Sequence, residues 1–162
     1  MTAIRTLVAL CCDPAFDLRS YDLSGAYLGT PLVRPVYIRL PPDAEEDAGK
    51  VLRCEKAIYG LRDSSAAFCR YLADQIQSFR HNGHKFQKLH MEQCLYYYHD
   101  DEGNRMIFCH YVDDLAIAST NPKLRDELLA HINKTWNVTD EGILQRFIGI
   151  NFWRSDCKRT WN

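Results

Sequence analysis

The sequence predicts an α+β protein in which an antiparallel sheet carries helices packed on one face. Three stretches repeat apolar residues with the period of a helix, shorter stretches alternate with the period of a strand, and a turn sequence joins two of these strands. Their order fits a ferredoxin-like core, in which strand, helix, strand, strand, helix and strand follow one another. No linker, repeat or low-complexity tract divides residues 1–162, so we expect a single domain.

The first third of the chain predicts one helix and three strands. Residues 2–12 place apolar side chains on one side of a helix, at Ile4, Leu7, Val8 and Cys11. Residues 16–23 and 33–40 alternate as strands do, and residues 50–58 predict a further short strand. The acidic segment between the last two, PPDAEEDAG at 41–49, predicts a solvated loop.

Two longer helices follow, each with a plausible start signal. Residues 64–79 carry an apolar stripe, and Ser64 or Ser65 fits the N-cap position. Residues 121–136 begin with Asn121 as N-cap and Pro122 at the first helical position. Their stripe consists of Leu124, Leu128, Ile132 and Trp136.

The strands around these helices are also readable. Residues 94–99 and 105–112 flank the turn sequence DDEGN and predict a hairpin. Residues 144–153, LQRFIGINFW, predict a buried closing strand.

Composition limits the class of protein without selecting a function. The chain has a formal net charge of −1 and is 46% hydrophobic, which neither requires nor excludes a nucleic-acid partner. Its apolar runs are shorter than the ~20 residues of a membrane span, and no leader pattern opens it. The seven cysteines show no CxxC spacing, which favours a reducing, intracellular location.

Adjacent carboxylates interrupt an apolar run in HYVDDLAIAS, residues 110–119. Asp113 and Asp114 would form the two-residue tip of a hairpin. An ordinary acidic turn is the more common explanation of such a pair taken alone, although the two charges repel each other unless a cation neutralises them.

A third acid strengthens the functional interpretation. Asp22 ends the strand in RSYDLSGAYL, and in a ferredoxin-like sheet that strand neighbours the central hairpin. Three carboxylates meeting there would suit Mg²⁺, which takes carboxylate, water and phosphate oxygens. Two such ions, about 4 Å apart, could activate a 3′-hydroxyl and stabilise a leaving pyrophosphate.

Five motifs in order resemble the reverse transcriptase of copia-type LTR retrotransposons. They are YDLSGAYL (21–28), VYIRLPP (36–42), KAIYGLRDSSAAF (56–68), YVDDLAIAS (111–119) and WNVTDEGILQRFIGI (136–150). The resemblance implies the palm of an RNA-directed DNA polymerase. It also implies two Mg²⁺ or Mn²⁺ ions, an RNA or DNA template-primer and deoxynucleoside triphosphates as substrates.

The resemblance also implies roles for single residues. Asp22, Asp113 and Asp114 would be the catalytic metal ligands, and the Leu23 carbonyl would complete one ion's shell. Ala26 and Tyr27 would border the substrate, with the Tyr27 ring excluding a ribose 2′-hydroxyl. Tyr111 would lie near the primer end. For Tyr27 and Tyr111, core packing remains an alternative.

The chain departs from the family pattern in places. Asp63 stands where many relatives have Gln, and Ser65-Ala66 where they have Pro-Arg. An acid beside a triphosphate is unfavourable, and either Arg62 compensates it or Arg62 is a solvated surface charge. We expect the fingers, thumb and RNase H of the family to be absent from this chain. The resemblance implies that integrase and RNase H domains of a polyprotein are partners, in a cytoplasmic virus-like particle.

Two alternatives stay open at this point. The chain could be an inactive relic or a domesticated binding module that keeps the fold. Separately, the spacing of His81, His84, His90 and Cys94 permits a zinc site, although spacing alone is weak support.

Overall fold

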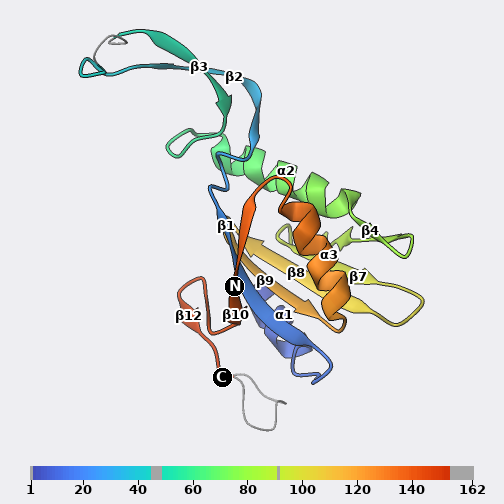
Figure 1. The fold of residues 1–162 in the computed structure, drawn as a ribbon. Helices are drawn as coiled ribbons and strands as arrows, with labels where there is room; N and C mark the ends of the chain where they lie inside the picture. The colour runs from blue at the N-terminus through green and yellow to red at the C-terminus, as the bar shows by residue number, and fades with distance from the viewer. Residues whose placement is uncertain (1, 45–48, 91, 154–162) are drawn as a thin grey trace.

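The computed structural model describes residues 2–44, 49–90 and 92–153 (Figure 1). The helices are α1 (Thr2–Leu10), α2 (Ser64–Ser78) and α3 (Pro122–Ile132). The longer strands are β1 (Asp17–Ser24), β2 (Pro31–Arg39), β3 (Val51–Lys56), β7 (Leu95–His99), β8 (Arg105–Tyr111), β9 (Asp114–Ser119) and β10 (Asn137–Ile143). Two-residue strands complete the set: β4 (Arg80–His81), β5 (His84–Lys85), β6 (Gln87–Lys88), β11 (Arg146–Phe147) and β12 (Ile150–Asn151).

A six-stranded antiparallel sheet forms the centre, in the order β10-β1-β9-β8-β7-β6. Helix α2 lies between β1 and the β7–β8 hairpin along the chain, and α3 lies between β9 and β10. The prediction of an α+β protein with an antiparallel sheet is confirmed. Strands β1 and β9 are antiparallel neighbours within the sheet, so the end of β1 meets the start of β9.

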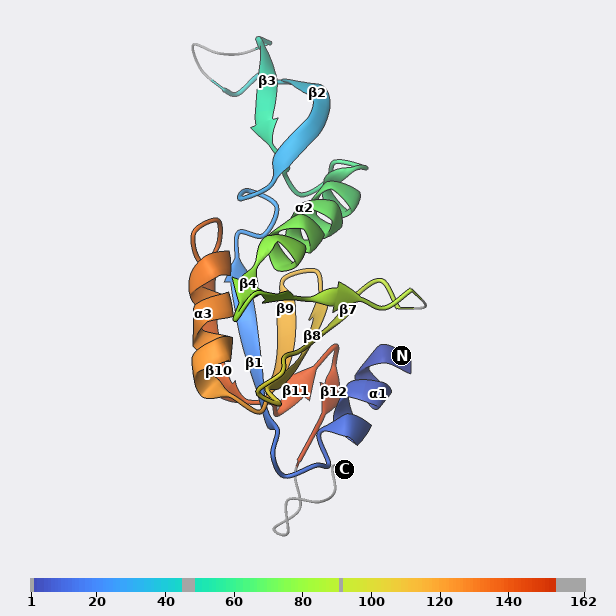
Figure 2. The same cartoon turned by 90° about the vertical axis from the view of Figure 1, so that its right-hand side faces the viewer.

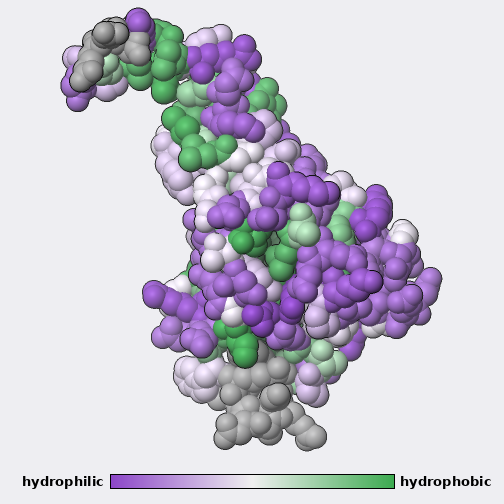
Figure 3. Space-filling view, in the orientation of Figure 1, coloured by the Kyte–Doolittle hydropathy of each residue, from purple (hydrophilic) through white to green (hydrophobic). Residues whose placement is uncertain are grey.

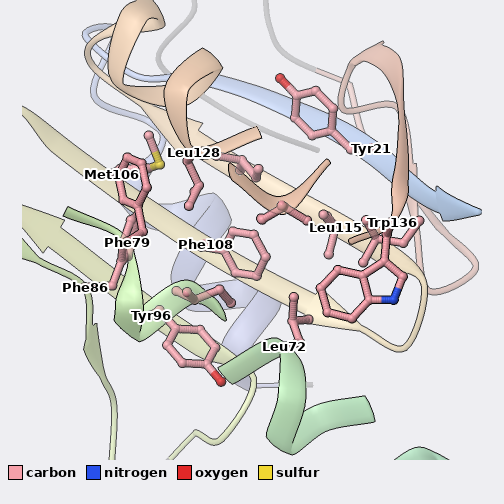
Figure 4. Packing of buried hydrophobic residues seen from close by; sticks show 14 of the residues in the cluster. Tyr21, Leu72, Phe79, Phe86, Tyr96, Met106, Phe108, Leu115, Leu128 and Trp136 are labelled. Atoms are coloured by element: carbon pink, nitrogen blue, oxygen red, sulfur yellow. The ribbon is translucent and has the colours of Figure 1, made fainter. Parts of the chain in front are cut away.

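Both faces of the sheet are covered, each by its own apolar cluster. On one face α2 and α3 pack through Phe68, Leu72, Leu124 and Leu128 against Phe108 and Leu115 (Figure 4). On the other face lie α1 and the β11–β12 hairpin (Figure 2). Their side chains Ile4, Leu7 and Phe147 form one cluster with Leu18, Ala116 and Ala118 of the sheet. Helices α2 and α3 therefore share one face as expected, but the expectation of helices on one face only is wrong for α1.

The start of α3 follows the sequence signal. The side chain of Asn121 accepts hydrogen bonds from the backbone N–H groups of Lys123 and Leu124, and Pro122 opens the helix. The helix ends at Ile132, so Trp136 lies beyond it and not within it as predicted.

The start of α2 differs from the prediction. Asp63 occupies the N-cap position without a side-chain capping bond, so neither Ser64 nor Ser65 is the N-cap. The Ser64 hydroxyl instead donates a 2.6 Å hydrogen bond to the Ile58 carbonyl, which ties the helix to the preceding loop.

The end of the chain also differs. Residues 144–153 do not form a single buried strand, because Ile148 and Gly149, both with positive φ, turn the chain between β11 and β12. Strand β10, which the apolar pattern does not reveal, pairs with β1 along the sheet edge.

A long hairpin of β2 and β3 projects from the end of the sheet where α2 begins (Figure 1). Both strands were predicted. The hairpin carries exposed apolar side chains at Val33, Val51 and Leu52 (Figure 3). No helix in the described part of the chain is long and apolar enough to cross a membrane.

Candidate active site

Strand pairing brings the predicted carboxylates to one end of the sheet. In the antiparallel ladder Asp22 of β1 lies directly opposite Asp114 of β9. The next pair towards the turn is joined by a 2.9 Å hydrogen bond from the Leu23 N–H to the Asp113 carbonyl. Directly opposed residues place their Cβ atoms roughly 4.5–5.5 Å apart, on the same face. Residues 92 positions apart in the chain are thus cross-strand neighbours.

The hairpin tip lies one residue earlier than predicted. Tyr111 pairs with Asp114, so the two turn residues are Val112 and Asp113, and Asp114 begins β9. Val112 has a φ of 54°, a left-handed value that a β-branched residue rarely adopts. The first central position of a type II′ turn requires such a value. Strain of this kind persists where surrounding pairing imposes it, here beside the carboxylates.

Alternation along the strands decides which way two of these carboxylates point. Asp22 follows Leu18 and Ser20 on one face of β1, and Asp114 precedes Ala116 and Ala118 on the same face of β9. Towards the other end of β1 and β9, α1 and the β11–β12 hairpin cover this same face of the sheet. Both carboxylates are half-buried.

The carboxylates form a locally negative site. Within the described residues, no lysine or arginine forms an ion pair with any of the three, and Asp22 accepts a 3.2 Å hydrogen bond from the Ser24 hydroxyl. Burial, reinforced by the charges of Asp113, Glu141 and Asp22, raises the pKa of Asp114 above its ordinary value. This repulsion is relieved by a proton or by a cation.

The described residues contain no group of three acidic, histidine or cysteine side chains gathered closely enough to ligate one ion. Mg²⁺ commonly takes only one or two carboxylates and completes its shell with water and substrate phosphates. The opposed Asp22 and Asp114, with Asp113 one residue away, match that smaller donor set.

Replacing Asp114 by asparagine should stabilise the metal-free protein at neutral pH. The folded state of the wild type binds a proton at Asp114 more readily than the unfolded state. The ionised Asp114 carboxylate therefore lowers the free energy of unfolding at neutral pH. This destabilisation is absent below the unfolded-state pKa of about 3.9 and is complete once the pH exceeds the raised pKa of the folded state. We expect the variant to melt roughly 1–2 °C higher at pH 7.5 in chelator, with the difference disappearing near pH 4. Added Mg²⁺ should raise the melting temperature of the wild type more than that of the variant. A variant that melts below wild type at pH 7.5 would contradict the electrostatic account.

Aromatic side chains lie beside the carboxylates. Tyr27, in the turn that follows β1, packs against Tyr59 with ring centroids 4.7 Å apart and against Phe68 at 6.0 Å. Tyr59 is 63% exposed. Burial, then the charge of Asp113, then Tyr27 and the charge of Asp22 raise the pKa of the Tyr59 hydroxyl. Through its contact with Tyr27, Tyr59 lies at the end of β1 that carries Asp22.

Trp136 fixes the turn that carries Tyr27. Its indole N–H donates a 2.8 Å hydrogen bond to the Ala26 carbonyl, which also accepts one from the Thr30 hydroxyl. Gly29 allows this close approach, since a Cβ there would lie 2.5 Å from the indole ring. The Ala26 side chain is fully buried and belongs to the core cluster that α2 and α3 form on the sheet.

The other predicted residues take varied positions. Tyr111, 53% exposed, ends β8 at the base of the hairpin, and Leu23 is buried in β1. Asp63 forms an ion pair with Arg34 of β2, whereas Arg62 is exposed. Arg34 thus compensates the charge of Asp63, and the exposed Arg62 fits the alternative of a solvated surface charge. Both members of the pair line a pocket of about 390 Å³ between β2 and α2.

The zinc hypothesis is wrong. His81 pairs with Glu127 at 2.7 Å and His84 with Asp101 at 3.3 Å, and the four candidate ligands form no cluster in the described structure. The six described cysteines are free thiols.

Sequence reasoning missed four residues around this site: Arg34, Tyr59, Trp136 and Glu141. Tyr59 stands within a motif that was recognised, so a signal for it existed. Trp136 was assigned to a helix stripe. Arg34 acts through an ion pair with Asp63, and Glu141 through the pairing of β10 with β1. Neither contact leaves a local pattern in the sequence.

Comparisons with known proteins agree with these motifs. The chain matches the family model described as reverse transcriptase (RNA-dependent DNA polymerase) over residues 1–159. It is 27% identical over 162 residues to the retrovirus-related Pol polyprotein from transposon TNT 1-94 of Nicotiana tabacum, covering 98% of this chain and 12% of that polyprotein. It is 26% identical over 139 residues to the putative transposon Ty5-1 protein of Saccharomyces cerevisiae, covering 83% of this chain and 42% of that protein. No solved structure matches the chain. The copia-type motifs thus predicted the affiliation correctly, and the chain belongs to the reverse transcriptase family.

Proposed function

We propose that this chain is the palm of an RNA-directed DNA polymerase and that residues 1–162 form one ferredoxin-like domain. The four strands β10-β1-β9-β8, with α2 and α3 as connections on one face, follow the order of that fold and support the proposal. The observation that carries the function is the pairing of Asp22 with Asp114 next to Asp113.

In this proposal Asp22, Asp113 and Asp114 hold two Mg²⁺ or Mn²⁺ ions, and the Leu23 carbonyl contributes to one shell. When bound, the ions would activate the primer 3′-hydroxyl and stabilise the leaving pyrophosphate. The residues of the chain hold the site in place. The β1–β9 ladder fixes Asp22 and Asp114 as neighbours, and the Val112–Asp113 turn presents the third carboxylate.

The aromatic residues would shape the substrate space. Tyr27, whose ring packs against Phe68, would lie beneath the sugar and exclude a 2′-hydroxyl. Tyr111, exposed at the base of the hairpin, would approach the primer end. Arg62 is exposed and forms no ion pair within the described residues, so it could meet a triphosphate or template phosphate. Because Arg34 already neutralises Asp63, that acid need not repel the nucleotide.

The relatives suggest partners. Since one of them is a Pol polyprotein, we propose that this chain acts together with other domains of such a polyprotein, with an RNA or DNA template-primer and deoxynucleoside triphosphates as substrates. Binding of template by the described chain alone would be weak, because phosphate contacts dominate affinity and the net charge is −1.

Primer extension tests the proposal. Purified protein is supplied with oligo-dT annealed to poly-rA, labelled dTTP, and Mg²⁺ or Mn²⁺. We expect incorporation that depends on the metal and stops in chelator. Folded protein that incorporates nothing with either metal, whether alone or with the remaining polyprotein domains, would overturn the proposal in favour of an inactive relic or binding module.

A further inference from the structure

Tyr59 is an exposed aromatic residue in a fixed position. It stands in the loop between β3 and α2, 63% exposed. The loop is tied on both sides of it: the Ala57 N–H donates to the Thr30 carbonyl at 2.9 Å, and Ser64 donates to the Ile58 carbonyl at 2.6 Å. Gly60, with a φ of 92°, turns the chain immediately after it. The backbone that carries the ring is therefore held in place, although solvent reaches the ring.

The ring of Tyr59 ends a row of aromatic contacts that begins in the core. Trp136 contacts Phe68 with centroids 5.7 Å apart, Phe68 contacts Tyr27 at 6.0 Å, and Tyr27 contacts Tyr59 at 4.7 Å. Trp136 and Phe68 are buried, Tyr27 is half-buried, and Tyr59 is exposed. One side of the Tyr59 ring thus rests on a rigid support and the rest of the ring is free for contact.

The free part of the ring lies at the end of the sheet that carries the carboxylates. Tyr59 packs against Tyr27, and the turn that holds Tyr27 follows directly after the end of β1 at which Asp22 pairs with Asp114. Burial, with smaller contributions from Asp113, Tyr27 and Asp22, raises the pKa of the Tyr59 hydroxyl. At neutral pH the hydroxyl therefore stays protonated and can donate a hydrogen bond. An exposed ring beside carboxylates provides an apolar contact surface that the carboxylates lack.

We propose that Tyr59 is a substrate-positioning residue whose ring contacts the nucleoside of the nucleotide bound at the Asp22–Asp113–Asp114 site. This inference rests on the proposed polymerase function. A planar ring is suited to a nucleoside because aromatic–base stacking tolerates any base. Tyr27 would then select the sugar, and Tyr59 would contribute binding that does not depend on the 2′ position.

The test is steady-state primer extension with three variants, Tyr59→Ala, Tyr59→Leu and Tyr59→Phe. At saturating template-primer, Tyr59→Ala and Tyr59→Leu should raise KM for deoxynucleotides roughly 10-fold, which corresponds to about 1.4 kcal/mol. The kcat should change less than about 3-fold, since a contact made equally in ground and transition states affects KM. Tyr59→Phe should restore most of the affinity. The ratio of deoxynucleotide to ribonucleotide incorporation should stay constant in all three.

Tyr37 provides the matched control, since it is 62% exposed and lies on the projecting β2–β3 hairpin. Tyr37→Ala should leave the nucleotide KM unchanged. An unchanged KM in Tyr59→Ala and Tyr59→Leu would overturn the inference. A changed preference for deoxynucleotides over ribonucleotides at constant KM would also overturn it, because Tyr59 would then act only by positioning Tyr27. Tyr59 is exposed, so the variants should fold, and thermal melting verifies this. Activity in the wild type with no effect at Tyr59 rejects this inference alone, whereas a wild type without activity rejects the polymerase proposal beneath it.

Discussion

Replacing Asp113 by asparagine should reduce RNA-templated incorporation of deoxynucleotides by at least about two to three orders of magnitude, the range for removing one preorganised electrostatic group. Asparagine keeps the size of the side chain and the backbone carbonyl that accepts the Leu23 N–H, but it removes the negative charge. The turn should therefore persist while the affinity for divalent cations falls. Primer extension at several Mg²⁺ and Mn²⁺ concentrations measures the loss.

A surface acid separates this effect from general charge loss. Asp101, whose side chain is 92% exposed in the turn between β7 and β8, should tolerate Asp101→Asn with full activity. Equal melting temperatures for Asp113→Asn and wild type would show that the fold is intact. If Asp113→Asn retained wild-type incorporation, the three carboxylates would not be the metal site.

Replacing Trp136 by alanine should destabilise the fold by about 3–5 kcal/mol. The residue is 2% exposed and fills the space between Phe68, Tyr71 and the glycine-containing turn after β1. Alanine would leave a cavity and remove the hydrogen bond to the Ala26 carbonyl. Urea unfolding followed by circular dichroism measures the change. Because this turn carries Tyr27, nucleotide selection should weaken in whatever fraction remains folded.

Two further variants test this explanation. Trp136→Phe keeps most of the packing and loses only the indole donor, and Thr30 still donates to the Ala26 carbonyl, so the cost should be nearer 1 kcal/mol. Trp153, 61% exposed, is the matched tryptophan, and Trp153→Ala should change stability by less than about 0.5 kcal/mol. Similar losses for Trp136→Ala and Trp153→Ala would contradict a specific role for the buried ring.

Local signals predicted much of the fold. Asn121 and Pro122 fixed the start of α3 because a cap and a proline act on the adjacent backbone only. The apolar stripes of α1 and α2 and the β7–β8 hairpin are likewise short-range patterns. By contrast, β10 was missed because its sequence, NVTDEGI, is polar and mostly exposed, and only hydrogen bonding to β1 makes it a strand.

For the candidate site, the amino-acid order by itself determined which carboxylates and which family to consider, because the motifs around Asp22 and Asp113 are contiguous in the chain. It could not determine that Val112 and Asp113 form the turn, with Asp114 already in β9. Nor could it determine that Arg34 pairs with Asp63 or that Tyr59 packs against Tyr27. Those facts depend on strand register and on contacts between distant segments. Only the tertiary structure decides them, because such contacts contribute to stability only after the sheet has brought the segments together.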